Sequence, residues 1–307
     1  MTPSRIIIDC DPGVDDAVAI LLAFAAPEAV KVEAITTVIG NVMLDKTTAN
    51  ALRVRDLAGR ADIPVYAGCP RPIMAPIERK NSVHGGDGLG DIDLPAPVTA
   101  TESEHAVDAI IRIVRDNPGQ ITLCPVGPMT NIALALIKAP DIIPLIPEIV
   151  FMGGAAFCPG NSSPAAEFNF MIDPHAAQIM LTAGIPLTMF GLDVTAQALI
   201  TRPWMDAVEA ASGAVGQAAV AMLRAYGHGD PCLHDPCVIA HLIDPTLFEG
   251  VDAWVEVETT APLARGQSVA AVAPRHRPGH EPNCRVITGL DAPRLFTLLA
   301  ERLISLG

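Results

Sequence analysis

The chain has 307 residues, half of them hydrophobic, and a formal net charge of −14. This charge argues against nucleic acid or an anionic membrane surface as a partner, and no apolar run reaches the roughly 18 residues of a membrane span. The first residues enter a predicted strand at once and leave no room for a signal peptide, so we expect a cytoplasmic protein. The seven cysteines include no C-x-x-C pair and are expected to be reduced thiols.

Strand-like and helix-like segments alternate along the first two thirds of the sequence. Strands are predicted at 6–8, 31–39, 63–66, 120–124, 148–152 and 186–190, and helices at 17–25, 44–57, 104–115, 131–138 and from Asp173. Such alternation predicts a parallel sheet with right-handed crossovers. Beyond Pro203 the pattern is mainly helical and closes with strands near 253–258 and 268–273 and a helix from Asp291. Because no repeat or linker interrupts the chain, we expect residues 1–307 to form a single α/β domain with an open, mainly parallel sheet flanked by helices.

The segment DCDPGVDD, residues 9–16, places four carboxylates directly after a short apolar strand and before a helix. In open α/β sheets, ligands bind at the carboxyl ends of strands. A helix-capping role, with Asp15 as the cap, would explain one or two of these acids. It does not explain Asp9 and Asp11, because like charges a few Å apart repel strongly unless a cation neutralises them. The segment therefore predicts a metal site.

Polar or glycine-rich turns also follow the other predicted strands. The groups that should meet at this edge of the sheet are Asn41, Val126-Gly127, Gly153-Gly154, Glu167, Asn169, Asp193 and His234-Asp235. Carboxylate and amide oxygens are the ligands preferred by hard cations such as Ca²⁺ and Mg²⁺. A carboxylate beside such a cation can accept a proton from a metal-held water, and an imidazole can give a proton to a leaving group.

Two histidines are candidates for that imidazole. His234 precedes an Asp-Pro helix start, where a histidine is more often structural. His84 lies among glycines in the long segment 68–100, and a loop of this length usually forms a lid or a binding loop.

Taken together, these segments resemble the nucleoside hydrolases, or nucleoside N-ribohydrolases. The resemblance lies in DCDPGVDD (9–16), IGN (39–41), VHGGDGL (83–89), VGPMTN (126–131), MGG (152–154), Asn161, EFN (167–169) and HDP (234–236). The segments occur in the family's order over nearly the whole chain. The resemblance implies a Rossmann-like core with Ca²⁺ at the base of the active site. It also implies cleavage of the N-glycosidic bond of ribonucleosides to ribose and free base.

The resemblance also implies a role for each residue. Asp11 would be the general base, and His234 would face the leaving base. Ca²⁺ would be held by the Asp11, Asp16 and Asp235 carboxylates and the Val126 carbonyl. The substrate would be bound by Asp15, Asn41, His84, Met152, Asn161, Glu167, Phe168 and Asn169, with Asp9 orienting the other acids.

Base preference and assembly follow from the resemblance as well. Family members that favour purines stack the base on tryptophans, whereas Trp204 and Trp254 lie outside the matching segments and His84 takes the corresponding place. We therefore expect a pyrimidine-preferring or broad-specificity enzyme. In the family, the segment around residues 223–231 touches the base. The sequence does not decide which of Arg224, Tyr226 and His228 reaches the substrate there. The mean hydropathy of +0.38 and the resemblance predict a homodimer or homotetramer.

Two other functions share part of this pattern. A haloacid-dehalogenase-type phosphatase also has a strand followed by Asp-x-Asp, but it needs a lysine at a polar strand end. The lysines, which are Lys31, Lys46, Lys80 and Lys138, do not lie at such ends. A nucleoside-binding paralogue without catalytic activity would not require both Asp11 and His234.

Overall fold

The computed structural model describes residues 2–76, 83–226 and 229–306. Within these residues, nine strands form one sheet in the order β3-β2-β1-β4-β5-β6-β9-β7-β8. Neighbouring strands from β3 to β9 are parallel, and β7 and β8 add an antiparallel extension at one end. The predicted α/β fold with an open, mainly parallel sheet is confirmed. The assignment of all residues 1–307 to one domain stays a prediction.

The strands are β1 (Ser4–Cys10), β2 (Val30–Thr37), β3 (Val65–Ala67), β4 (Ile121–Pro125), β5 (Ile149–Met152), β6 (Leu187–Phe190), β7 (Phe248–Val257), β8 (Ser268–Ala271) and β9 (Cys284–Leu290). The α-helices are α1 (Val14–Phe24), α2 (Leu44–Leu57), α3 (Ala106–Asp116), α4 (Thr130–Lys138), α5 (Phe168–Ile172), α6 (Pro174–Leu181), α7 (Leu192–Thr195), α8 (Arg202–Ala211), α9 (Ala214–Tyr226), α10 (Pro236–Ile243) and α11 (Ala292–Ser305). Short 3₁₀ helices lie at η1 (Pro140–Leu145), η2 (Pro245–Leu247) and η3 (Pro274–His276).

The C-terminal third differs most from the sequence prediction. Strand β9 was not predicted, and β7 begins at Phe248 rather than near residue 253. The apolar run in β9 is only Val286-Ile287, too short to indicate a strand by itself. It pairs with β6 on one side and β7 on the other, which gives its backbone N–H and C=O groups hydrogen-bond partners and makes it part of the sheet.

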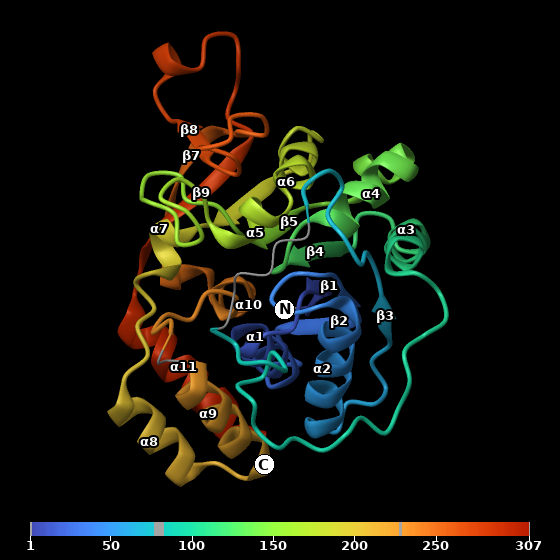
Figure 1. The fold of residues 1–307 in the computed structure, drawn as a ribbon, viewed down its shortest axis with the longest axis vertical. Coiled ribbons are helices and arrows are strands. Elements are labelled where there is room, and N and C mark those ends of the chain that lie inside the picture. The colour runs from blue at the N-terminus through green and yellow to red at the C-terminus, as the bar shows by residue number, and fades with distance from the viewer. Residues whose placement is uncertain (1, 77–82, 227–228, 307) are drawn as a thin grey trace.

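Hydrophobic side chains cover both faces of the sheet. Along β1, Ile6 and Ile8 belong to one buried cluster and Ile7 to the other, as the pleat of a strand requires. The first cluster includes residues of α1, α2, α9, α10 and α11, and the second includes residues of α3, α4 and α6. Figure 1 shows these two helix layers on opposite sides of the sheet, with the β7–β8 extension projecting at the top.

Two further expectations concern the cysteines and the membrane. The seven cysteines form no disulfide, as predicted, and all except Cys158 are buried. In the part of the chain that the structure describes, no helix is long and apolar enough to cross a membrane.

The strand order reverses at the centre of the sheet. From β1 the chain proceeds to β2 and β3 on one side, and from β4 it proceeds to β5 and β6 on the other. The loops after β1 and β4 therefore diverge, and a crevice opens between them at the carboxyl ends of the strands. The acidic segment follows β1 directly, and Val126 follows β4.

Asn131 joins three strand ends beneath this crevice. Its Nδ2 donates to Asp9 Oδ1 at 2.7 Å and to the Thr37 carbonyl at 3.0 Å, and its Oδ1 accepts from the Cys69 backbone N–H at 2.9 Å. Asn131 is fully buried. The residue therefore ties β1, β2 and the segment after β3 to the start of α4.

We predict that Asn131→Ala lowers the free energy of unfolding by about 3 kcal/mol or more, because it leaves buried polar groups without partners. Urea denaturation measures this loss. Asn117→Ala is the matched control, since Asn117 is half-buried and its Nδ2 donates to one carbonyl, that of Ile113, at 2.9 Å. It should cost about 1 kcal/mol. Equal losses in the two variants would contradict the role assigned to Asn131.

Candidate active site

A cavity of about 340 Å³ opens at the carboxyl ends of the central strands. It is lined by Asp11, Asp15, Asn41, Val83, His84, Val126, Met152, Asn161, Ser162, Glu167, Phe168, Asn169, Tyr226, Gly229, Asp230, His234 and Asp235. The structure thus brings the predicted site residues together around one cavity. Asp16 is the exception, because it is fully buried behind the lining.

The turn between β1 and α1 is held by the carboxylate of Asp16. Its Oδ2 accepts from the Gly13 backbone N–H at 2.9 Å, and its Oδ1 accepts from the Asp11 backbone N–H at 3.2 Å. Asp16 rather than Asp15 therefore makes the capping contact, and Asp15 lines the cavity. Position 13 requires glycine because the His84 ring packs closely against it: a Cβ there would lie 2.5 Å from His84 Nδ1.

Buried carboxylates crowd at the base of the cavity. Asp15, Asp16 and Asp235 each offer an oxygen, and these oxygens lie within 4.8 Å of one another. Burial, and then the neighbouring carboxylates, raise the pKa of Asp16 to about 7 and raise the pKa values of Asp11 and Asp235 well above their ordinary range. Within residues 2–76, 83–226 and 229–306, no lysine or arginine forms an ion pair with these acids.

This donor set fits a hard divalent cation, because a bound cation would relieve the repulsion and all three donors are oxygens. Two of them, Asp16 and Asp235, are among the predicted Ca²⁺ ligands. The third is Asp15, which the resemblance assigns to ribose. The predicted ligand set with Asp11 and Val126 stays a prediction.

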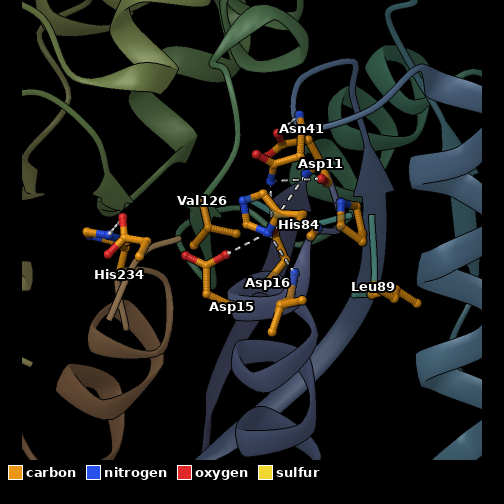
Figure 2. Close-up of polar contacts among 12 residues, drawn as sticks. Asp11, Asp15, Asp16, Asn41, His84, Leu89, Val126 and His234 are labelled. Atoms are coloured by element: carbon orange, nitrogen blue, oxygen red, sulfur yellow. Dashed lines mark hydrogen bonds and ion pairs between the residues drawn. The ribbon is translucent and has the colours of Figure 1, made fainter. Parts of the chain in front are cut away.

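Asn41 connects Asp11 and Asp16, two of the three acids that follow β1. Its backbone N–H donates to Asp11 Oδ2 at 2.6 Å, and its Nδ2 donates to Asp16 Oδ2 at 3.2 Å and to the Asp11 carbonyl at 3.3 Å. These contacts fix the Asp11 carboxylate against the turn after β2. Figure 2 shows Asp11, Asn41 and Asp16 grouped with Asp15 and His84.

Glu167 and Asn169 line the cavity from the start of α5. The Glu167 carboxylate accepts backbone N–H groups from Gly154 at 2.8 Å, Asn169 at 2.8 Å and Phe170 at 3.2 Å, so it is fixed at the start of α5. Burial nevertheless raises its pKa. Asn169 Nδ2 donates to the Val126 carbonyl at 2.8 Å. The loops after β4 and β5 are thereby tied to α5.

His84 reaches the cavity from the long loop and contacts the start of α1. Its Nδ1 accepts from the Val14 backbone N–H at 3.0 Å, so the ring proton of the neutral form lies on Nε2. Burial lowers the pKa of His84. Its ring centroid lies 5.1 Å from that of Tyr226, and its Nδ1 lies 3.8 Å from Asp15 Oδ1. His84 is therefore a neutral donor facing the cavity.

His234 lies on a different segment, directly before Asp235 and helix α10. Its Nδ1 is 2.7 Å from Thr195 Oγ1, and its Nε2 is 3.1 Å from Asp230 Oδ2. Burial alone would lower its pKa, but Asp230 and then Asp15 and Glu167 raise it above the ordinary value. In Figure 2 His234 is set apart from the acids grouped around Asp11. The two histidines thus enter the cavity in different charge environments.

Some of the residues around the cavity could not be predicted from the sequence. Tyr226 lines the cavity, whereas Arg224 forms ion pairs with Asp206 and Glu209 at 2.7 and 2.6 Å and does not; His228 lies outside the described residues. Thr195 was missed, although it closely follows the polar turn at the end of β6.

Asp193 also has a different place from the one expected. It does not line the cavity, and instead accepts the backbone N–H groups of Ala156 and Phe157 at 2.8 and 2.7 Å. Its function in the structure is to hold the loop after β5.

Comparisons with known proteins agree with this geometry. The family described as inosine-uridine preferring nucleoside hydrolase matches residues 6–297. A pyrimidine-specific ribonucleoside hydrolase, RihA, of Shewanella baltica is 42% identical over 97% of this chain and 96% of its own length. A purine-preferring ribonucleoside hydrolase from Gardnerella vaginalis superposes with a TM-score of 0.91 at 34% identity, covering 98% of each chain.

A plant nucleoside hydrolase, PpNRh1, also has a TM-score of 0.91, at 32% identity and over 98% of this chain and 99% of its own. The match to the family model spans nearly the whole sequence, and the relatives are covered almost end to end. The chain therefore belongs to the inosine-uridine preferring nucleoside hydrolase family and is a ribonucleoside N-glycosidic hydrolase.

Proposed function

We propose that this hydrolase uses Ca²⁺ and that it prefers pyrimidine nucleosides or accepts both classes of base. The observation that carries the proposal is the composition of the cavity. Carboxylate and amide oxygens, including those of Asp11, Asp15 and Asn41, line it, with His84 beside Asp15 and His234 apart from them (Figure 2). The oxygens suit a cation and a ribose, and the imidazoles suit a leaving base.

Asp16 and Asp235, with Asp11 and the Val126 carbonyl, would hold the cation. When bound, it would supply a grip on the ribose hydroxyls and lower the pKa of the attacking water. The mutual repulsion of Asp11, Asp16 and Asp235 supports this assignment, because buried acids that have no lysine or arginine partner among the described residues favour a divalent ion.

Asp11 is the proposed general base. Its Oδ2 is held by the Asn41 N–H at 2.6 Å, so its carboxylate has a fixed direction at the base of the cavity. Loss of the base from the sugar generates a ribosyl cation of oxocarbenium character, as in other glycoside cleavages. The ring of carboxylates, including Asp15 and Glu167, stabilises that positive charge more than it stabilises the neutral substrate.

The base preference rests on what the cavity offers. Among the described residues, neither tryptophan lines it: the Trp204 ring lies 5.1 Å from that of Phe296, and the Trp254 ring lies 4.2 Å from that of His280. His84 and Tyr226 supply smaller ring faces. The name of the Shewanella baltica relative supports a pyrimidine preference, and the name of the Gardnerella vaginalis enzyme supports purines.

The other functions considered receive less support. Among the described lysines, Lys31 pairs with Glu33, Lys138 pairs with Asp108, and Lys46 donates to the Gly86 carbonyl. The structure therefore gives no described lysine to a phosphoryl site; Lys80 lies outside the described residues. A non-catalytic nucleoside binder would leave the fixed geometry of Asp11 and His234 without a purpose.

Asp11→Asn should lower kcat for uridine by orders of magnitude, because general-base help alone contributes ~10²–10⁴-fold. Calcium content is measured on the same sample, so that loss of the metal is separated from loss of the base. Asp206→Asn is the control, since Asp206 is an exposed acid of α8 that does not line the cavity, and this variant should keep normal turnover and calcium content. A metal-replete Asp11→Asn enzyme with normal turnover would remove Asp11 from the mechanism.

His234→Ala should lower kcat for inosine more than for uridine, because a purine leaves more easily once a ring nitrogen is protonated. With 4-nitrophenyl riboside, whose leaving group needs no proton, the variant should be nearly unimpaired. His105→Ala, which removes a cap at the start of α3, is the control and should leave the ratio of the three rates unchanged. Equal loss on all three substrates would show that His234 does not donate a proton to the base.

We also propose that the enzyme is a homodimer or homotetramer. Support comes from large apolar side chains that are strongly exposed in the isolated chain, including Met74, Val98 and Leu263 at 69%, 86% and 94%. Light scattering on the purified protein at micromolar concentration should give a mass of two or four chains. A monomer under these conditions would contradict the proposal.

A further inference from the structure

Asp230 lines the cavity but has no role in the proposed reaction. Its side chain is 25% exposed, and it lies close to the end of α9 in the described segment that begins again at Gly229. Its carboxylate is held at both oxygens: Oδ1 accepts from the Cys232 backbone N–H at 3.0 Å, and Oδ2 lies 3.1 Å from His234 Nε2. The carboxylate therefore has one direction, toward the imidazole.

The backbone that carries Asp230 and His234 is also anchored. Ile200 N–H donates to the Pro231 carbonyl at 2.7 Å, and Leu233 N–H donates to the Ala198 carbonyl at 3.0 Å. These bonds attach the segment between the two residues to the chain that follows α7. The distance between Asp230 and His234 is thus set by a fixed strand-like segment.

Both nitrogens of the His234 ring are engaged in this arrangement. A carboxylate only accepts hydrogen bonds, so the bond to Asp230 requires a proton on Nε2. The Thr195 hydroxyl, 2.7 Å from Nδ1, can either donate or accept and therefore imposes no choice. Asp230 alone decides that His234 presents an Nε2–H group.

We propose that Asp230 is a positioning residue that fixes His234 as an Nε2–H donor at the leaving-group end of the cavity. The partly exposed carboxylate holds this proton until a nucleobase replaces it as the acceptor. The inference rests on the proposed function of His234 as the group that faces the leaving base. No bond to carbon forms or breaks at Asp230, so it acts through His234 alone.

A double-mutant cycle tests this dependence directly. Asp230→Ala should lower kcat for inosine by about 10–100-fold, the usual loss when the partner that orients a functional histidine is removed, with a much smaller change in KM. Hydrolysis of 4-nitrophenyl riboside should be nearly unchanged. In the His234→Ala background, Asp230→Ala should cause no further loss, because the residue through which it acts is absent.

Asp230→Asn provides a graded second variant. Its amide oxygen can accept from one of the two donors, so its activity should lie between those of the wild type and Asp230→Ala. Asp206→Ala is the matched control: it removes an exposed carboxylate from α8, and Arg224 retains its ion pair with Glu209. This control should behave as the wild type with every substrate.

The imidazole tautomer provides a readout besides activity. In ¹⁵N-histidine-labelled full-length protein, the signals lost in His234→Ala identify its ring, which should be bound to a proton at Nε2 in the wild type and change in Asp230→Ala. The inference would be overturned if the kcat losses caused by Asp230→Ala and His234→Ala multiplied in the double variant. It would also be overturned if Asp230→Ala lowered kcat equally for all substrates. A wild-type protein inactive on every nucleoside would instead refute the proposed function, and the ring signals would still decide whether Asp230 holds His234.

Discussion

The repulsion among buried carboxylates at the carboxyl ends of β1 and β4 is the constraint on which the site depends. Asp11, Asp16 and Asp235 are almost inaccessible to solvent, and burial together with their neighbours raises their pKa values. Such a cluster is costly unless protons or a cation neutralise it. Since the donors are oxygens, a hard divalent cation meets this need and also suits the hydroxyls of a ribose.

The fold supplies the means to hold these acids together. The reversal of strand order between β1 and β4 opens the crevice, and Asn131 and Asn41 connect the loops that border it. Asp9, which the resemblance places behind the other acids, accepts from Thr36 Oγ1 at 2.6 Å and from Asn131. The acids are therefore held by neutral donors, which leaves their charge available to a cation.

The parts of the structure that were predictable have local signals. A short apolar strand, an acidic turn and a helix predict the position of Asp11 and Asp16, and the alternation of elements predicts the parallel sheet. Contacts between distant segments have no such signal. The bonds from Val14 to His84 and from Thr195 to His234 join residues far apart in sequence, and β9 becomes a strand only because β6 and β7 flank it.

The need for a cation is tested most directly by ribose release from uridine, measured with the purified full chain before chelation, after chelation and after Ca²⁺ is restored. We expect hydrolysis by the native enzyme, its loss in the metal-free protein and its recovery with Ca²⁺, because the crowded acids need the cation to bind ribose and place the water. Undiminished hydrolysis by protein shown to be metal-free would contradict it, and so would recovery with Zn²⁺ but not with Ca²⁺.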